Sequence, residues 1–261
     1  MMNFFDWIGR RCIESFFYVS DLTYFMLRVF SVWKPHRHVF NRAVYSVFLE
    51  QLILNGINAI AIISFLAMVV GISIASQLVF IIATITGAKD LVEILARLIL
   101  SEMGPLIAGV VMVGRSCSGM VVDLGNAKVD GEIEPLQYLG INVDDYFVLP
   151  RIVCMVISQV VLALYFSAIM LMFGMLFSVL FYDLSIQVSL KELLNLVTVY
   201  SLFMFMLKNI LFGLIIGTLA CFHGLSVKNS PTQVSEQMKK AVVRSVVFLF
   251  LVDAYFISFT L

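Results

Sequence analysis

Three charged side chains inside long apolar stretches are the first candidates for chemistry: Glu102, Lys208 and Asp253. An unpaired charge at the centre of a membrane helix costs about 2.5–3.5 kcal/mol on insertion scales. We therefore expect these residues to face the interior of a helix bundle and to form ion pairs, with Lys208 pairing with Glu102 or Asp253. Arg115 and Arg244 also interrupt apolar stretches, and we count them with the other three as charges near a substrate path.

Two interpretations of these charges stay open from the sequence. In one, they form a polar patch in a substrate path or at a contact between moving helices. In the other, they form a structural ion pair that locks the bundle. The residue types fit both equally well.

A second candidate site is the acidic segment 123–145, which contains a short helical pattern at about 126–140. A short amphipathic helix on a loop can be bound in the groove of a partner protein. The alternative is an ordinary solvated loop helix. The candidate contact residues are Lys128, Glu132, Ile133, Glu134, Leu136 and Leu139.

The sequence lacks the motifs expected for nucleotide binding, disulfide bonds, metal sites and nucleic-acid binding. The chain has no GxxxxGK[ST] motif for binding ATP phosphates, so we expect no nucleotide site and no enzyme activity of its own. The four cysteines are scattered, which predicts packing residues and neither a disulfide framework nor a metal site. A formal net charge of +0 gives no electrostatic reason to expect nucleic acid as a partner. No cofactor is expected.

The elements that position these residues are predicted to be membrane helices. Hydrophobic residues make up 61% of the 261 residues, charged residues 13%, and the mean hydropathy is +1.02. A soluble domain carries roughly a quarter charged residues, so this surface must face lipid. The predicted fold is an all-α integral membrane protein with an interfacial N-terminal helix, five transmembrane helices and a short cytoplasmic helix. We expect an N-terminal interfacial or cytoplasmic segment at 1–50 and a five-span domain at 51–261, with spans at about 55–86, 91–122, 148–181, 193–222 and 241–260.

The distribution of basic residues predicts the orientation. The first 50 residues hold six Lys or Arg, and the loops 123–151 and 223–240 add more, whereas the two opposite loops hold only Lys89 and Lys191. Basic residues accumulate on the cytoplasmic side. The N-terminus is therefore expected in the cytoplasm and the C-terminus on the outer face.

One block of the sequence, residues 102–140, is specific enough to indicate a protein family. EMGPLIAGVVMVGR at 102–115 resembles the E-x-G-P … A-G-R stretch of MlaE-family permeases. DLG from Asp123, KV from Lys128, EIEPL from Glu132 and LGI from Leu139 are similar to the continuation of that family toward its coupling helix. Weaker similarity extends over roughly residues 40–260.

The resemblance implies an assembly. Family members pair as two copies at a central axis, and each copy docks on a cytoplasmic ABC ATPase subunit through the loop after the second span. A ring of MCE-domain lipid-binding proteins lies on the outer face, and the substrate is phospholipid or another hydrophobe moved between inner and outer membranes. For this chain it implies the inner membrane as the location, envelope lipid homeostasis as the role, and a coupling helix at about 126–140.

The sequence departs from the family at three places. Ser101 stands where many members have Arg, and Pro135 stands where they usually have an acidic residue. Proline is tolerated in the first turn of a helix, so the coupling helix is expected to begin near Pro135. Segment 230–239 replaces a Gly-rich stretch of the family with Pro231 and polar residues.

Three other functions are alternatives to a permease. An ion- or proton-coupled secondary transporter would use Glu102, Lys208 and Asp253 as a relay. An intramembrane enzyme would need a pair such as Ser116 and His223. A purely structural membrane anchor leaves the loop helix and the buried charges without a task.

Overall fold

The structure is a computed structural model that describes residues 17–29, 42–82, 94, 97–140, 142–182, 198–228 and 230–260. Every regular element in these ranges is helical. Outside the described residues lie 1–16 with Cys12, 30–41, 83–93, 95–96, 141, 183–197, 229 and 261. The expected all-α fold is confirmed for the part of the chain that is described.

Five of the described helices are long and apolar enough to cross a membrane. They cover Val47–Gln77, Ile99–Val129, Asp144–Phe181, Val199–Leu225 and Pro231–Ser258. The elements within them are α2 (Arg42–Asn55), η1 (Ile57–Ala59), α3 (Ile60–Ile82), α5 (Gly104–Met112), α6 (Ser118–Val129), α8 (Leu149–Tyr182), α10 (Val199–Leu225) and α11 (Pro231–Thr260). The expectation of five spanning helices is met.

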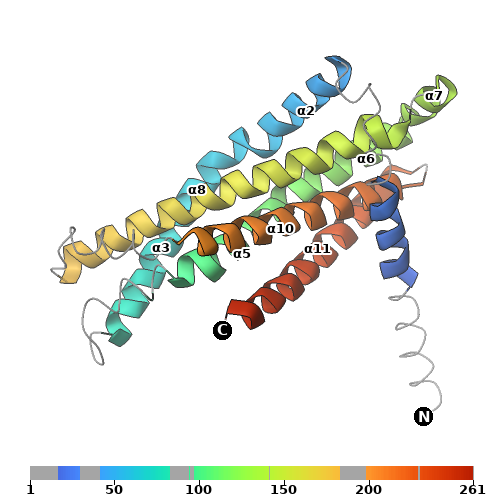
Figure 1. Cartoon of the computed structure of the whole chain (residues 1–261). Helices are drawn as coiled ribbons and strands as arrows, with labels where there is room; N and C mark the ends of the chain where they lie inside the picture. The colour runs from blue at the N-terminus through green and yellow to red at the C-terminus, as the bar shows by residue number, and fades with distance from the viewer. Residues whose placement is uncertain are drawn as a thin grey trace, which may run out of the picture.

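The long helices lie side by side in one elongated bundle (Figure 1). α8 packs against α3 and α10, and α10 also packs against α6 and α11. Glycine permits the α8–α10 contact, because a Cβ at Gly213 would lie 2.6 Å from Val156 Cα. Small residues let membrane helices approach closely. Gly213 and Gly217 therefore form the close contact of α10 with α8.

In the described part of the chain, three π-helical turns interrupt the regular helices. The second span contains η2 (Ile99–Met103) and η3 (Val113–Cys117), and η4 (Asp144–Val148) leads into α8. In η2 the Gly104 N–H donates to the carbonyl of Ile99, five residues earlier. Such turns are frequent at functional sites, and η2 carries Glu102.

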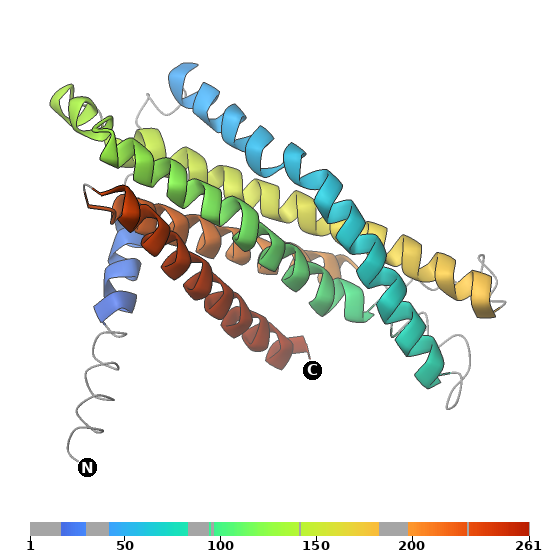
Figure 2. The ribbon, with the colours of Figure 1, turned by 180° about the vertical axis from the view of Figure 1, so that it is seen from behind.

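The two ends of the bundle differ. At one end the short helix α7 (Ile133–Tyr138) protrudes past the long helices, and helix 17–29 lies against the turn between α10 and α11 (Figure 1). The view from behind in Figure 2 gives the same arrangement. The start of α10 and the end of α11 lie toward the opposite end (Figure 1). Lys208 and Asp253, which form the ion cluster described next, lie nearer to these ends of their helices than to the others.

Candidate functional site

Lys208 joins two carboxylates from two other helices. Its Nζ lies 3.2 Å from Oε2 of Glu102 and 2.6 Å from Oδ1 of Asp253. The Lys208 side chain is 3% exposed and that of Glu102 is 27% exposed. The predicted pairing of Lys208 is confirmed with both partners. Two carboxylates share one ammonium, so the cluster carries one negative charge in excess when all three groups are ionised.

A backbone carbonyl completes the surroundings of the ammonium. Lys208 Nζ donates to the carbonyl of Ser101 over 2.8 Å. In a regular α-helix that carbonyl would accept from the N–H of the residue four positions later. Position 105 is proline, which has no N–H to donate. The donor of a regular α-helix is therefore missing at the Ser101 carbonyl, which accepts from Lys208.

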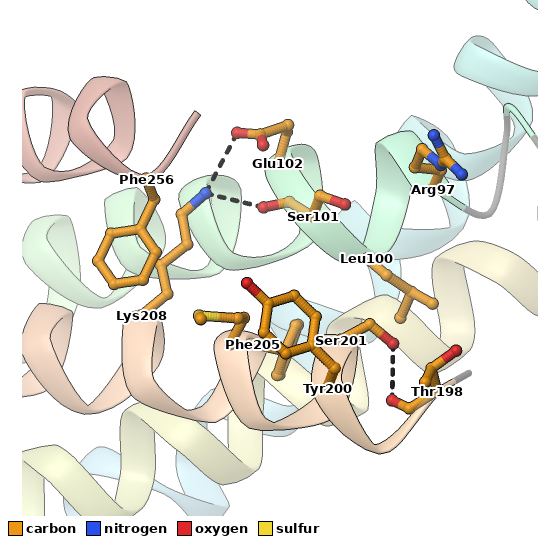
Figure 3. Close-up of a pocket in the computed structure, with 11 residues that line it drawn as sticks. Arg97, Leu100, Ser101, Glu102, Thr198, Tyr200, Ser201, Phe205, Lys208 and Phe256 are labelled. Carbon is orange, nitrogen blue, oxygen red and sulfur yellow. Dashed lines mark hydrogen bonds and ion pairs between the residues drawn. The ribbon is translucent and has the colours of Figure 1, made fainter. Parts of the chain in front are cut away.

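A pocket of about 400 Å³ opens beside this cluster. Figure 3 shows Glu102, Ser101 and Lys208 converging on one side of it, with Phe256 beside Lys208 and Arg97 on the side away from Lys208. The pocket combines apolar walls with charged and hydroxyl groups, as ligand sites usually do. Its lining is Arg97, Leu100, Ser101, Glu102, Thr198, Tyr200, Ser201, Met204, Phe205, Lys208 and Phe256.

Arg115 and Arg244 lie apart from the Lys208 cluster. Arg115 Nη2 donates to the carbonyl of Leu54 over 3.0 Å, which ties η3 to the end of α2. The Arg244 guanidinium lies 3.7 Å from the centre of the Tyr18 ring, at the α7 end of the bundle. Their proximity to a substrate path stays a prediction.

The candidate coupling residues lie on and next to α7. Ile133 is buried, Glu132 and Glu134 are exposed, and Leu136 is half-buried. Leu139 is 74% exposed. Lys128 donates from the end of α6 to the carbonyl of Leu225. Pro135 lies in the first turn of α7, as its restricted backbone requires.

Sequence reasoning missed several residues of these sites. Tyr138 is 88% exposed beside Leu139, although it was not among the candidate contacts. Arg97 and Tyr200 line the pocket. Residue type gave no signal for them, because an aromatic residue or an arginine near the end of a membrane helix is ordinary.

Ser116 and His223 are not joined by a hydrogen bond in the described structure. Ser116 Oγ contacts Met112 Sδ. His223 instead contacts Tyr18, Gln237 and Arg244. The pair that an intramembrane serine enzyme would need is therefore not formed here. Cys117, Cys154 and Cys221 are buried free thiols, which confirms them as packing residues.

Comparison with known proteins extends over most of the chain. The family model described as Permease MlaE matches residues 48–259. A probable ABC transporter permease protein of Synechocystis is 27% identical over 80% of this chain and 80% of its own length. One from Rickettsia bellii is 22% identical over 99% of this chain and 97% of its own length. The protein TRIGALACTOSYLDIACYLGLYCEROL 1, chloroplastic, of Arabidopsis thaliana is 25% identical over 81% of this chain, which spans 60% of that relative. With five helices able to span a membrane and a family match over this length, the chain is an integral membrane protein that belongs to the MlaE permease family.

Proposed function

We propose that this chain is the membrane-spanning subunit of an ATP-driven transporter that moves phospholipid or a similar hydrophobe between the inner and outer membranes. The family match over residues 48–259 carries this proposal. ATP hydrolysis then belongs to a cytoplasmic ABC ATPase, since the chain has no P-loop motif. A second copy of the chain and an MCE-domain protein on the outer face complete the assembly, and the N-terminus faces the cytoplasm.

The pocket beside Lys208 supports a lipid substrate. Phe205, Phe256 and Met204 offer apolar surface, while Glu102 and Arg97 place opposite charges on the same lining. A phospholipid has this mixture of apolar and charged groups at the junction of its acyl chains and headgroup. The Arabidopsis relative carries the name of a galactolipid, which agrees with a lipid substrate here.

The protruding helix α7 supports an ATPase partner. Tyr138 and Leu139 are exposed at its C-terminal end, beyond the long helices. Exposed aromatic and aliphatic side chains can anchor a protein interface when a partner pocket encloses them. Docked there, an ATPase that closes on ATP would move α7 and shift the bundle between two states.

The proposal is tested by co-purification from detergent. Wild-type protein should bring down an ABC ATPase, whereas the Glu132→Lys/Leu136→Asp double variant should not. Asp21→Asn, an exposed change on helix 17–29, serves as the control that should retain the ATPase. Absence of an ATPase from the wild-type sample contradicts the proposal and favours a self-contained transporter that uses Glu102, Lys208 and Asp253.

A further inference from the structure

Helix 17–29 is attached at its two ends to different parts of the bundle. Near its start, the Tyr18 ring packs edge-on against Phe222 of α10, with 5.7 Å between ring centroids. The Arg244 guanidinium of α11 covers a face of the same ring at 3.7 Å. Near its end, Arg28 Nη2 lies 2.7 Å from Asp144 Oδ2 in η4. One short helix therefore connects α10 and α11 to the start of α8.

His223 holds the first attachment together. The Arg244 N–H groups can only donate, so His223 Nε2 accepts from Arg244 at 3.3 Å and from the Tyr18 hydroxyl at 3.1 Å. The other ring nitrogen, Nδ1, then carries the hydrogen and donates to Gln237 Oε1 over 2.8 Å. Burial raises the pKa of the Tyr18 phenol above its ordinary value, although the charge of Arg244 acts in the opposite direction. The phenol therefore keeps the proton that it donates.

The second attachment lies next to the protruding helix. Asp144 is the first residue of η4, which follows α7 and the short connection after Leu139. Its side chain is 5% exposed, although that of Arg28 is 55% exposed. A buried carboxylate depends on its partner much more than an exposed one does. A displacement of the α7–η4 segment therefore pulls directly on Arg28.

We propose that helix 17–29 is a coupling strut, which carries displacement of the α7–η4 segment to α10 and α11. This inference rests on the proposed function, because it takes α7 as the place where the ATPase acts. The strut adds to the direct packing of α6 against α10 and α11 and to the bond from Lys128 to Leu225. It reaches α11 through Arg244 and α10 through His223, so both helices receive the motion at one point.

The test uses the complete transporter, with its ATPase and outer-face partner, reconstituted in phospholipid vesicles. The measured quantity is lipid transported per ATP hydrolysed, together with the amount of assembled complex. Arg28→Gln and Tyr18→Ala should each lower this ratio by about two- to thirtyfold, which is the range that mutations between two coupled sites produce. The amount of assembled complex should not change. The double variant should be no worse than the more severe single one, since both changes break the same strut. Asp21→Asn, an exposed change on the same helix, should leave the ratio unaltered.

Conservative variants keep the test decisive if an alanine variant does not assemble. Arg28→Lys retains the charge opposite Asp144 and should restore most of the ratio. Tyr18→Phe retains the ring under Arg244 and should lose less than Tyr18→Ala. An unchanged ratio with less assembled complex, or losses in the double variant that multiply, would make the helix a stabilising clamp and overturn the strut. Lack of ATP-driven transport in the wild type would instead overturn the proposed function, and the strut with it.

Discussion

Removal of the Lys208 ammonium should destabilise the protein, because it leaves Glu102 and Asp253 without a cation. Breaking a buried ion pair from one side costs about 3–5 kcal/mol. Protonation limits the loss, since adding a proton to a free carboxyl group at pH 7 costs about 4 kcal/mol from its reference pKa. Glu102 lines the pocket and is 27% exposed, whereas Asp253 is 11% exposed, so the main penalty falls on Asp253. We therefore expect Lys208→Met to lower the free energy of unfolding by about 3–4 kcal/mol.

Thermal unfolding in detergent measures this effect. On the scale of soluble domains of similar size, 3–4 kcal/mol lowers the melting temperature by about 6–16 °C. Lys240→Met is the matched control, because Lys240 pairs with Glu236 at 2.6 Å on an exposed helix surface. Exposed ion pairs contribute little, so the control should melt with the wild type. Equal melting of Lys208→Met and Lys240→Met would refute the reasoning.

A triple variant separates stability from function at this site. Glu102→Met, Lys208→Met and Asp253→Leu together remove all three charges and leave apolar side chains of similar volume. Replacing a buried ion network in this way is often neutral or stabilising. A triple variant as unstable as Lys208→Met would show that packing, and not unpaired charge, causes the loss. A stable triple variant that no longer transports places the charges in the substrate path, whereas a stable and active one makes them a structural lock.

Three further predictions concern packing, thiols and orientation. Gly213→Ala should cost about 1–3 kcal/mol by overpacking against α8, measured by thermal unfolding, while Gly119→Ala has open space and should not destabilise. In a Cys12→Ser background, a maleimide should label the chain only after unfolding, because the other three thiols are buried: Cys117, Cys154 and Cys221. Tyr138→Cys and Tyr200→Cys, each in a cysteine-free background, should react with a membrane-impermeant reagent from opposite sides of the membrane, the first from the cytoplasm. Labelling of both from the same side would contradict the proposed orientation.

The pairing of Lys208 was predictable because it follows from solvation alone. A charge inside a long apolar run must find a partner, and few candidates of opposite charge lie within the spans. The number of spans follows in the same way from hydropathy. Both predictions use only the free energy of moving a side chain from water into lipid. This free energy depends on the residue type and not on the fold.

The orientation of each helix about its own axis, which decides which face meets which neighbour, was not predictable from the sequence. The π-helical turn η2 shifts the register of the second span just where Glu102 lies, and apolar residues on all sides conceal such a shift. Arg244 illustrates the consequence, since its contact with the Tyr18 ring was not among the predicted contacts. A uniformly apolar helix has no periodicity that fixes which face meets which neighbour. The partners of Arg244 therefore emerge only from the packed structure.

Two helices connect the pocket with the protruding end of the bundle. α10 carries Lys208 near the pocket and His223 at the other end, about 22 Å apart along a straight helix. α11 carries Asp253 near the pocket and Arg244 toward the other end, about 14 Å apart. Both pairs are cross-linked, Lys208 to Asp253 at 2.6 Å and His223 to Arg244 at 3.3 Å. Because α10 and α11 are joined at both levels, we expect a force applied near His223 to tilt them together and to reach the wall of the pocket. The excess carboxylate, Glu102, lies on η2 outside this unit, so the Glu102–Lys208 contact at 3.2 Å is the one that such a tilt would open first.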